Sequence, residues 1–206
     1  MRKLTALVAV AVLAATDAAG AGKSADRVTT RDVSLDFVGH VTNSPPGVSP
    51  AASSQYGYLS YVGGVPAFKR EPADESSALF TFDARATVVR VLASGPLRII
   101  TRVGRLTIYS DPAANGSFAN PATFSDGKRV LVASFRQQAV IDTLTSAFTT
   151  TNRNKILSTA PFRADRTTVR LGRVGARFDT ILSGHVNMPA PPSGYFAGST
   201  TAFRAP

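Results

Sequence analysis

The sequence of 206 residues contains no cysteine and no tryptophan, and it has only two histidines and two glutamates, Glu71 and Glu75. Without cysteine, the chain cannot form disulfides, use a thiolate as a nucleophile or bind a metal through sulfur. Its fold must therefore be stabilised by the packing of its core, which a single domain of this length can supply.

Long hydrophobic runs are also absent, except at the N-terminus. Arg2 and Lys3 precede an uncharged apolar run, Leu4–Ala15, that is too short to span a bilayer as a helix, and Ala19–Ala21 forms a small-residue cleavage site. The pattern predicts a secretory signal peptide over residues 1–21 and a secreted or periplasmic protein; a retained anchor or a buried core helix is the alternative. No later stretch approaches the ~18 apolar residues of a membrane helix, so no transmembrane segment is expected after signal cleavage.

Negative charge is scarce, because 13 Asp and Glu residues stand against 23 Lys and Arg residues, and the net charge is +10. Eighteen of the basic residues are arginine, which binds phosphate, carboxylate and sulfate groups bidentately. A positive field attracts anionic partners, and a solvated basic surface with no partner is the alternative. Nucleic acid is not expected, since aromatic residues are not interleaved with the basic ones as stacking platforms.

The rest of the chain alternates apolar and polar residues in the manner of half-buried strands, with no persuasive helical periodicity. About eight extended segments with turns between them predict an all-β domain, a closed antiparallel barrel over residues 31–188, with a β-sandwich as the alternative. A polar segment, residues 22–30, precedes the barrel, and a Pro/Gly-rich tail, residues 189–206, follows it. The extended segments are residues 33–41, 55–65, 79–88, 97–109, 129–151 and 169–186, some of them long enough to be broken in two.

Three local features refine this prediction. Asp126-Gly127 between apolar runs predicts a two-residue hairpin with a type I′ turn, and residues 140–148 are the one stretch where a helix is tolerated. Arg98 and Arg102 share one strand face because their spacing is even. The strand lengths and chain length are similar to those of calycin-like and allene-oxide-cyclase-like small barrels, but no diagnostic motif accompanies the resemblance and no family is assigned.

The two histidines lie in similar surroundings, Gly-His-Val followed by a proline-containing segment, within the predicted first and last strands. If those strands are neighbours in a closed barrel, His40 and His185 meet at one mouth, and Asp36 lies on the same strand face as His40. These three are the candidate acid/base residues; chance recurrence of the tripeptide is the alternative. No metal-ligand, nucleophile-elbow or cofactor motif accompanies them, so neither a metal nor a cofactor is expected.

Two further groups are candidate binding residues. Tyr56, Tyr58, Tyr61 and Tyr109 are aromatics that would line a barrel pocket, with core packing as the alternative use. Arg170, Arg173 and Arg177 belong to a basic run that would dock an anionic polymer. The sequence therefore predicts an exported binding protein for a small apolar ligand or an anionic cell-envelope component. A secreted hydrolase or isomerase is the alternative, and an outer-membrane barrel is a third possibility.

Overall fold

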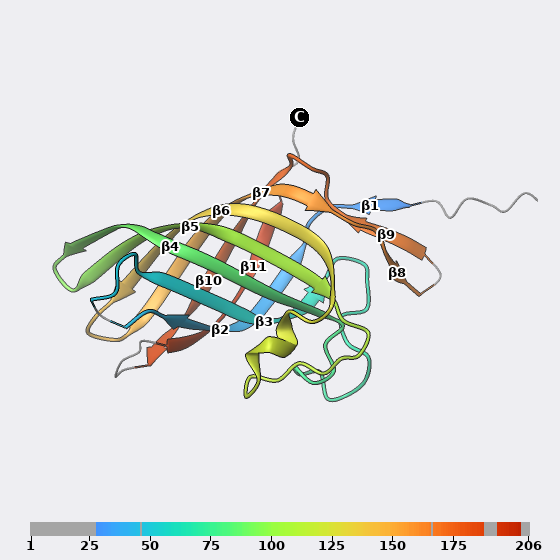
Figure 1. The fold of residues 1–206 in the computed structure, drawn as a ribbon, viewed down its shortest axis with the longest axis horizontal. Coiled ribbons are helices and arrows are strands. Elements are labelled where there is room, and N and C mark those ends of the chain that lie inside the picture. Colours follow the sequence, from blue (N-terminus) through green and yellow to red (C-terminus); the bar gives the residue numbers. More distant parts are fainter. Residues whose placement is uncertain (1–27, 46, 166, 188–192, 203–206) are drawn as a thin grey trace, which may run out of the picture.

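The computed structural model describes residues 28–45, 47–165, 167–187 and 193–202. In this part of the chain, eight long strands form one closed barrel in the order β10-β11-β2-β3-β4-β5-β6-β7, and every neighbouring pair is antiparallel (Figure 1). The predicted fold class is thus confirmed. The expected signal peptide lies outside the described residues.

Around the barrel, neighbouring strands follow one another in sequence order. Three short strands lie outside the barrel and form a separate sheet in the order β1-β9-β8. The barrel strands are β2 (Leu35–Asn43), β3 (Ala52–Val62), β4 (Phe80–Ser94), β5 (Leu97–Ser110), β6 (Lys128–Asp142), β7 (Ala147–Thr159), β10 (Arg177–Asn187) and β11 (Ser193–Ala202). The short strands are β1 (Thr29–Arg31), β8 (Phe162–Ala164) and β9 (Thr167–Leu171), and a short 3₁₀ helix, η1, spans Pro121–Phe124.

Side-chain alternation explains why these segments are strands. Along β2, Leu35 and Phe37 are buried inside the barrel, while Asp36 and Val38 face outward and are half-exposed. Gly39 occupies an inward position where a Cβ would come within 2.8 Å of the Phe82 ring and 2.9 Å of the Phe196 ring. The missing side chain therefore makes room for two aromatic rings in a core of fixed width.

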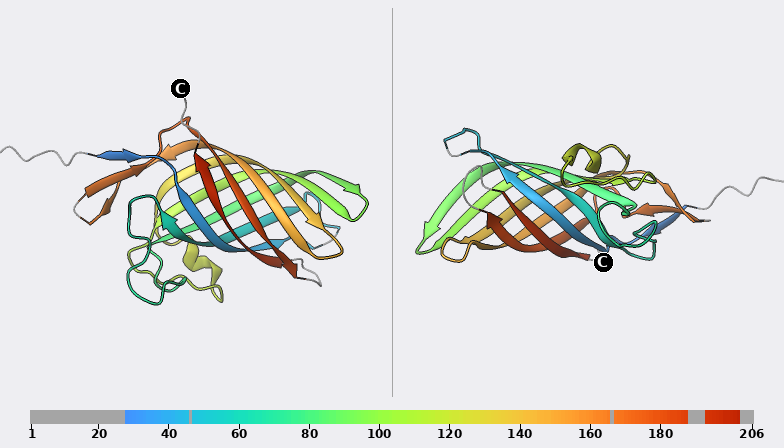
Figure 2. Two further views of the ribbon diagram at one scale, coloured as in Figure 1. Left: turned by 180° about the vertical axis from the view of Figure 1, so that it is seen from behind. Right: turned by 90° about the horizontal axis from the view of Figure 1, so that it is seen from below.

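The small sheet covers one end of the barrel (Figures 1 and 2). The Phe162 ring, on β8, lies 5.2 Å from the Phe80 ring at the start of β4. Val169 and Leu171 on β9 are buried in the same hydrophobic core as the barrel residues, and the Thr159 hydroxyl donates a 2.8 Å hydrogen bond to the Leu171 carbonyl. The barrel thus has one capped end, and we call the other end open because no described sheet or helix covers it.

The predicted hairpin at Asp126-Gly127 is wrong. Neither residue adopts the positive φ of a type I′ turn, and β5 and β6 are joined by a long loop, residues 111–127. A Cβ on Gly127 would lie 2.7 Å from the Ser110 carbonyl oxygen, so this glycine serves a close backbone approach instead. The stretch in which a helix was tolerated contains the end of β6, a turn and the start of β7.

The prediction that residues 189–206 form a tail outside the barrel needs a correction for residues 193–202. These residues form β11, which is hydrogen-bonded between β10 and β2. The pattern concealed this strand because two of its inward positions, Gly194 and Gly198, carry no side chain, and Phe196 is its one large inward residue. At Gly198, a Cβ would collide with the backbone of β10, so the glycines permit close pairing of the strands.

Candidate binding site at the barrel mouth

The open end of the barrel holds a cavity of about 490 Å³, which we call the mouth. Its walls come from the β2–β3 loop, the β4–β5 hairpin and the β6–β7 turn, and most of its lining is apolar. This volume lies within the usual range for small-molecule sites. The apolar lining residues include Val48, Val88, Val91, Ile100, Ile141 and Val186, and the polar ones include Asn43, Arg98, Arg102, Asp142 and Thr143.

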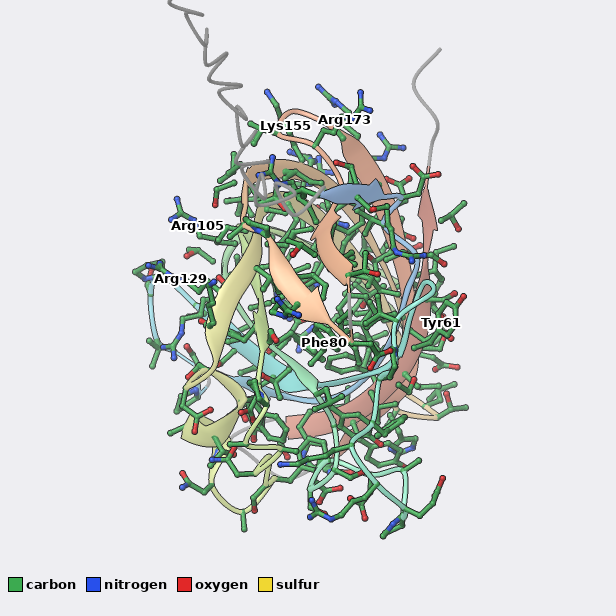
Figure 3. The ribbon with its side chains drawn as sticks, turned by 90° about the vertical axis from the view of Figure 1, so that its right-hand side faces the viewer. Tyr61, Phe80, Arg105, Arg129, Lys155 and Arg173 are labelled. Atoms are coloured by element: carbon green, nitrogen blue, oxygen red, sulfur yellow. The ribbon has the colours of Figure 1, made fainter. Side chains whose placement is uncertain are left out.

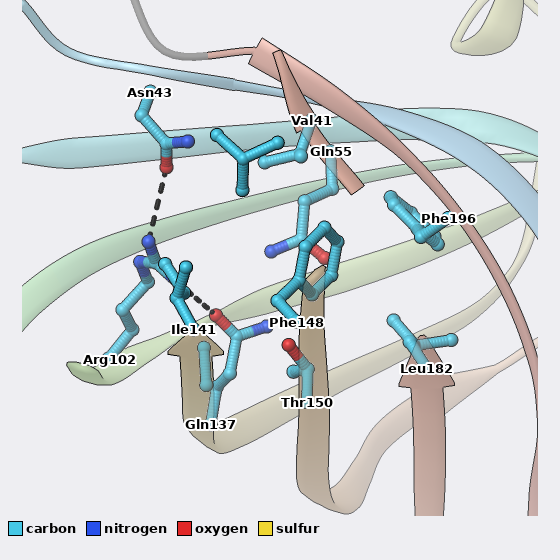
Figure 4. A pocket seen from close by; sticks show the side chains of 12 residues that line it. Val41, Asn43, Gln55, Arg102, Gln137, Ile141, Phe148, Thr150, Leu182 and Phe196 are labelled. Carbon is cyan, nitrogen blue, oxygen red and sulfur yellow. Dashed lines mark hydrogen bonds between the residues drawn. The ribbon is translucent and has the colours of Figure 1, made fainter. Parts of the chain in front are cut away.

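Arg102 lies at the inner limit of the mouth, where it also lines a small cavity of about 30 Å³ in the barrel interior (Figure 4). Its side chain points inward from β5 and is only 7% exposed. One terminal nitrogen donates to Gln137 Oε1 at 2.8 Å, and the other donates to Asn43 Oδ1 at 3.1 Å. Both partners are neutral amides, and among the described residues no carboxylate lies within ion-pair distance.

Within the described residues, the guanidinium of Arg102 is therefore a buried charge without a counter-ion. Burial lowers its pKa to about 10, so the group is still charged at neutral pH. Its Nε is also buried and has no hydrogen-bond partner in the part of the chain that the structure describes. Burying an unpaired charge costs on the order of several kcal/mol of folding free energy. A bound anion would offset that cost through charge-assisted hydrogen bonds.

The interior beyond Arg102 is filled by side chains. Gln137 Nε2 donates a 2.9 Å hydrogen bond to Asn152 Oδ1, and the Asn154 amide donates to the Thr180 hydroxyl at 3.1 Å. The voids left between these polar groups and the aromatic core measure about 30 Å³ and about 20 Å³, which is room for single waters only. A ligand body must therefore remain in the mouth.

His40 and His185 do not meet at the mouth. Both face outward, and Tyr195 of β11 stands between them, in register with His40 on β2 and with His185 on β10. The His40 ring stacks on Phe118 at a centroid distance of 4.1 Å. Two strand spacings separate the two histidine backbones, about 10 Å. The intervening β11, which the pattern did not reveal, is the reason. Asp36 also faces outward, next to buried neighbours at the other end of β2.

The tyrosines predicted to bind a ligand all lie outside the mouth lining. Tyr56 and Tyr58 face outward from β3 and contact the ring of Phe118, which the loop of residues 111–127 places over them. Tyr61 is 47% exposed, and Tyr109 is half-buried on the outer face of β5. Their role in binding stays a prediction.

The three arginines of the predicted docking run are separated by the fold. Arg170 lies on β9 in the capping sheet, Arg173 lies in the turn that follows, and Arg177 begins β10. Even spacing did place Arg98 and Arg102 on one face, as the structure confirms, since both line the mouth. The sequence pattern does not say which face of the strand is inside, and for that reason Arg102 was not singled out.

Within the described residues, no helix is long and apolar enough to cross a membrane, and no group of His, Cys, Asp or Glu side chains could hold a metal ion. Protein-family models, curated proteins and solved structures were all compared with this chain, and none of them matches it.

Proposed function

We propose that this protein is an exported binding protein that takes an amphipathic small molecule into the barrel mouth, with an anionic head group at Arg102. The observation that carries the proposal is the buried guanidinium of Arg102, which has two neutral partners and, among the described residues, no carboxylate within ion-pair distance. Export is supported by the N-terminal sequence pattern alone.

The anionic head is the part of the ligand that Arg102 selects. A guanidinium carries five N–H donors in a planar fork, and among the described residues the hydrogen bonds of Arg102 use only one donor on each terminal nitrogen. A carboxylate or sulfonate can accept hydrogen bonds from the remaining donors, and it matches the guanidinium in both charge and geometry. Arg98 lies four residues earlier, on the same lining, and adds a second positive charge nearer to solvent.

The apolar body of the ligand follows from the walls. Val88 and Val91 line the mouth from β4, Ile100 lines it from β5, and Ile141 and Val186 line it from β6 and β10. Burying apolar surface here contributes about 25 cal/mol per Å². Since the interior beyond Arg102 holds voids of water size only, the body must extend outward from the head group.

Catalysis is less well supported than binding at this site. The one carboxylate among the described mouth residues is Asp142, whose Oδ1 accepts the backbone N–H of Leu144 at 2.9 Å. That bond and those from Thr145 lower the pKa of Asp142, which keeps it ionised as part of a turn. The two histidines that an enzyme would use as acid/base groups face the outer wall.

Direct titration with chain-matched ligands tests the proposal. Dodecanoate, dodecanol and dodecylamine share one apolar tail and differ in the head group, and calorimetry on the purified protein measures each affinity. Dodecanoate is expected to bind best, and Arg102→Met is expected to weaken it about ten- to a hundred-fold, the worth of a hydrogen bond to a charged group.

Arg105→Met is the matched control, because Arg105 lies on the same strand with its side chain on the outer, exposed face. It removes one arginine from β5 without changing the mouth. Equal affinity for dodecanoate and dodecanol, or an equal loss in both variants, would show that Arg102 does not select the ligand.

A further inference from the structure

A row of cationic and hydroxyl side chains crosses the outer wall of the barrel, on the opposite side of the sheet from the ligand mouth. Arg85 on β4 is in register with Arg105 on β5, and Arg105 is in register with Ser134 on β6. Ser134 is in turn in register with Lys155 on β7, which pairs with Arg177 on β10. We call these five residues the basic row. Figure 3 faces the capped end of the barrel, where Arg105 and Lys155 lie at its outer edge and Phe80 lies within.

The row continues in the other direction with hydroxyl groups only. Arg85 is in register with Ser54 on β3, and Ser54 is in register with Thr42 on β2. Seven consecutive in-register positions therefore carry either a cation or a hydroxyl group. All seven can donate hydrogen bonds to anionic or sugar oxygens.

Like charges face each other directly within this surface. Arg85 pairs with Arg105, Lys155 pairs with Arg177, and in the adjacent row Arg136 on β6 pairs with Arg153 on β7. Directly opposed like charges destabilise a sheet. Three such pairs on neighbouring strands form a surface that an anionic partner would stabilise.

Acidic residues compensate this surface only in part. Asp83 Oδ2 lies 3.3 Å from Arg85 Nε, but the Arg85 side chain is 78% exposed, so most of its donors face solvent. Asp179 is in register with Arg153. Two carboxylates thus stand beside six cations, and a net positive charge is left over an area that spans five strands.

The same wall is hollowed where the basic row begins. A groove of about 610 Å³ lies across β2 to β6. Its lining includes three members of the basic row, Arg85, Arg105 and Ser134, and the two hydroxyl residues that continue it, Thr42 and Ser54. A linear chain can therefore lie across the strands in contact with successive members of the row, one for each strand spacing of ~4.8 Å.

We propose that the basic row binds an anionic polysaccharide, a sugar chain that carries carboxylate or sulfate groups. Arg85, Arg105 and Lys155 provide the charge complementarity, while Ser54 and Ser134 are hydrogen-bonding partners for sugar hydroxyls. The row contains no aromatic side chain on which a base could stack, which disfavours a nucleic acid. The groove shares Asn43, Ser44 and Ala52 with the mouth lining, so the two sites adjoin at the β2–β3 loop, whereas Arg85 and Arg105 line the groove and not the mouth.

Affinity measurements with two defined polymers test the inference, with polygalacturonate as the carboxylate form and heparin as the sulfate form. Arg105→Gln/Lys155→Gln is expected to weaken binding of the recognised polymer about ten-fold, because each exposed ion pair contributes up to about 1 kcal/mol. Arg129→Gln/Arg173→Gln removes the same charge from two exposed positions outside the row and is expected to change affinity little. Arg102→Met is expected to leave polymer binding unchanged.

Three outcomes would overturn the inference. The first is the absence of binding to either polymer at low salt, and the second is an equal loss of affinity in the two charge-matched variants. The third is tighter binding of single-stranded oligodeoxyadenylate than of both polysaccharides. Folding of Arg105→Gln/Lys155→Gln is checked by thermal unfolding. Its melting temperature is expected to equal or exceed that of the wild type, because the variant removes repulsion between like charges.

Discussion

Arg102 is the charge on which the proposed binding depends, and its burial also costs folding free energy. Its guanidinium lies near the amides of Asn43, Gln137 and Gln55 in the small interior cavity, whose described lining contains no acid. Folding must remove this charge from water, and the hydrogen bonds from neutral amides recover only part of its hydration. Binding sites often lower the stability of the free protein in this way, because the group that would compensate the buried charge is the ligand.

Gln137→Glu would supply the missing counter-ion within the protein. The substitution is isosteric and places a carboxylate at the position that now accepts the 2.8 Å hydrogen bond from Arg102. We expect it to raise the free energy of unfolding at pH 7 by about 1–3 kcal/mol, measured by urea denaturation, and to weaken dodecanoate binding.

The pH dependence of this variant gives a second test. A carboxylate beside a buried guanidinium has its pKa depressed in the folded state. The added stability is therefore present above the unfolded value of about 4.3 and is lost as the pH falls through the folded value. A variant that is less stable than wild type at pH 7, or that binds dodecanoate as tightly, would contradict the role given to Arg102.

At the scale of elements, the long loop of residues 111–127 is attached to the outside of β2 and β3 by aromatic contacts. Phe118 stacks on His40, and Phe124, which is fully buried, lies 5.8 Å from the Tyr56 ring. Burial lowers the pKa of His40, and the negative charge of Glu75 opposes that shift. The neutral imidazole is thus the form that the docked loop favours.

Acidification is expected to weaken this docking. The unfolded chain takes up a proton on His40 near pH 6.5 while the folded chain resists it, so stability is lost as the pH falls below that value. We expect the melting temperature to fall between pH 7.5 and pH 5.5, and the fall to be smaller in His40→Phe. His185→Phe is the control, since this ring is exposed and stacks only on Tyr195 among the described contacts. Identical pH profiles for wild type and His40→Phe would contradict the role of His40.

The strands that could be predicted are those in which apolar and polar residues alternate, so that the sequence indicates an inner and an outer face. Residues 33–41 and 79–88 alternate regularly, and both became barrel strands. β11 could not be predicted in this way, because Gly194 and Gly198 leave its inward face without an apolar signal. The error at the histidines followed from it, since their distance depends on a strand that the pattern did not reveal.

The site was predictable only in outline. Alternation placed Arg98 and Arg102 on one face, but a buried arginine on the inner face is contrary to the usual apolar filling of a small barrel. The basic row was out of reach for a different reason. Its members are up to 92 positions apart in the sequence (Arg85 to Arg177), and only the register between strands aligns them.

For the whole molecule, the net charge of +10 and the opposed cations of the outer wall predict stabilisation by salt. The Debye length falls from about 30 Å at 10 mM salt to about 8 Å at 150 mM, which screens repulsion among surface cations. We expect the melting temperature to rise by about 2–4 °C over this range, equivalent to about 1 kcal/mol. Arg105→Gln/Lys155→Gln is expected to show a smaller rise. A melting temperature that is constant or falls with salt would contradict the prediction.

The position of β11 also determines the order in which this molecule can fold. β11 is the last strand among the described residues, yet it lies between β2 and β10, and the Thr200 hydroxyl accepts a hydrogen bond from the Leu35 N–H, 165 positions away. Until residues 193–202 are available, β2 and β10 each have an unpaired edge. Ring closure is therefore a late and non-local event. A chain that is still being synthesised contains open sheet and no barrel, and the barrel with its mouth forms only once β11 is available.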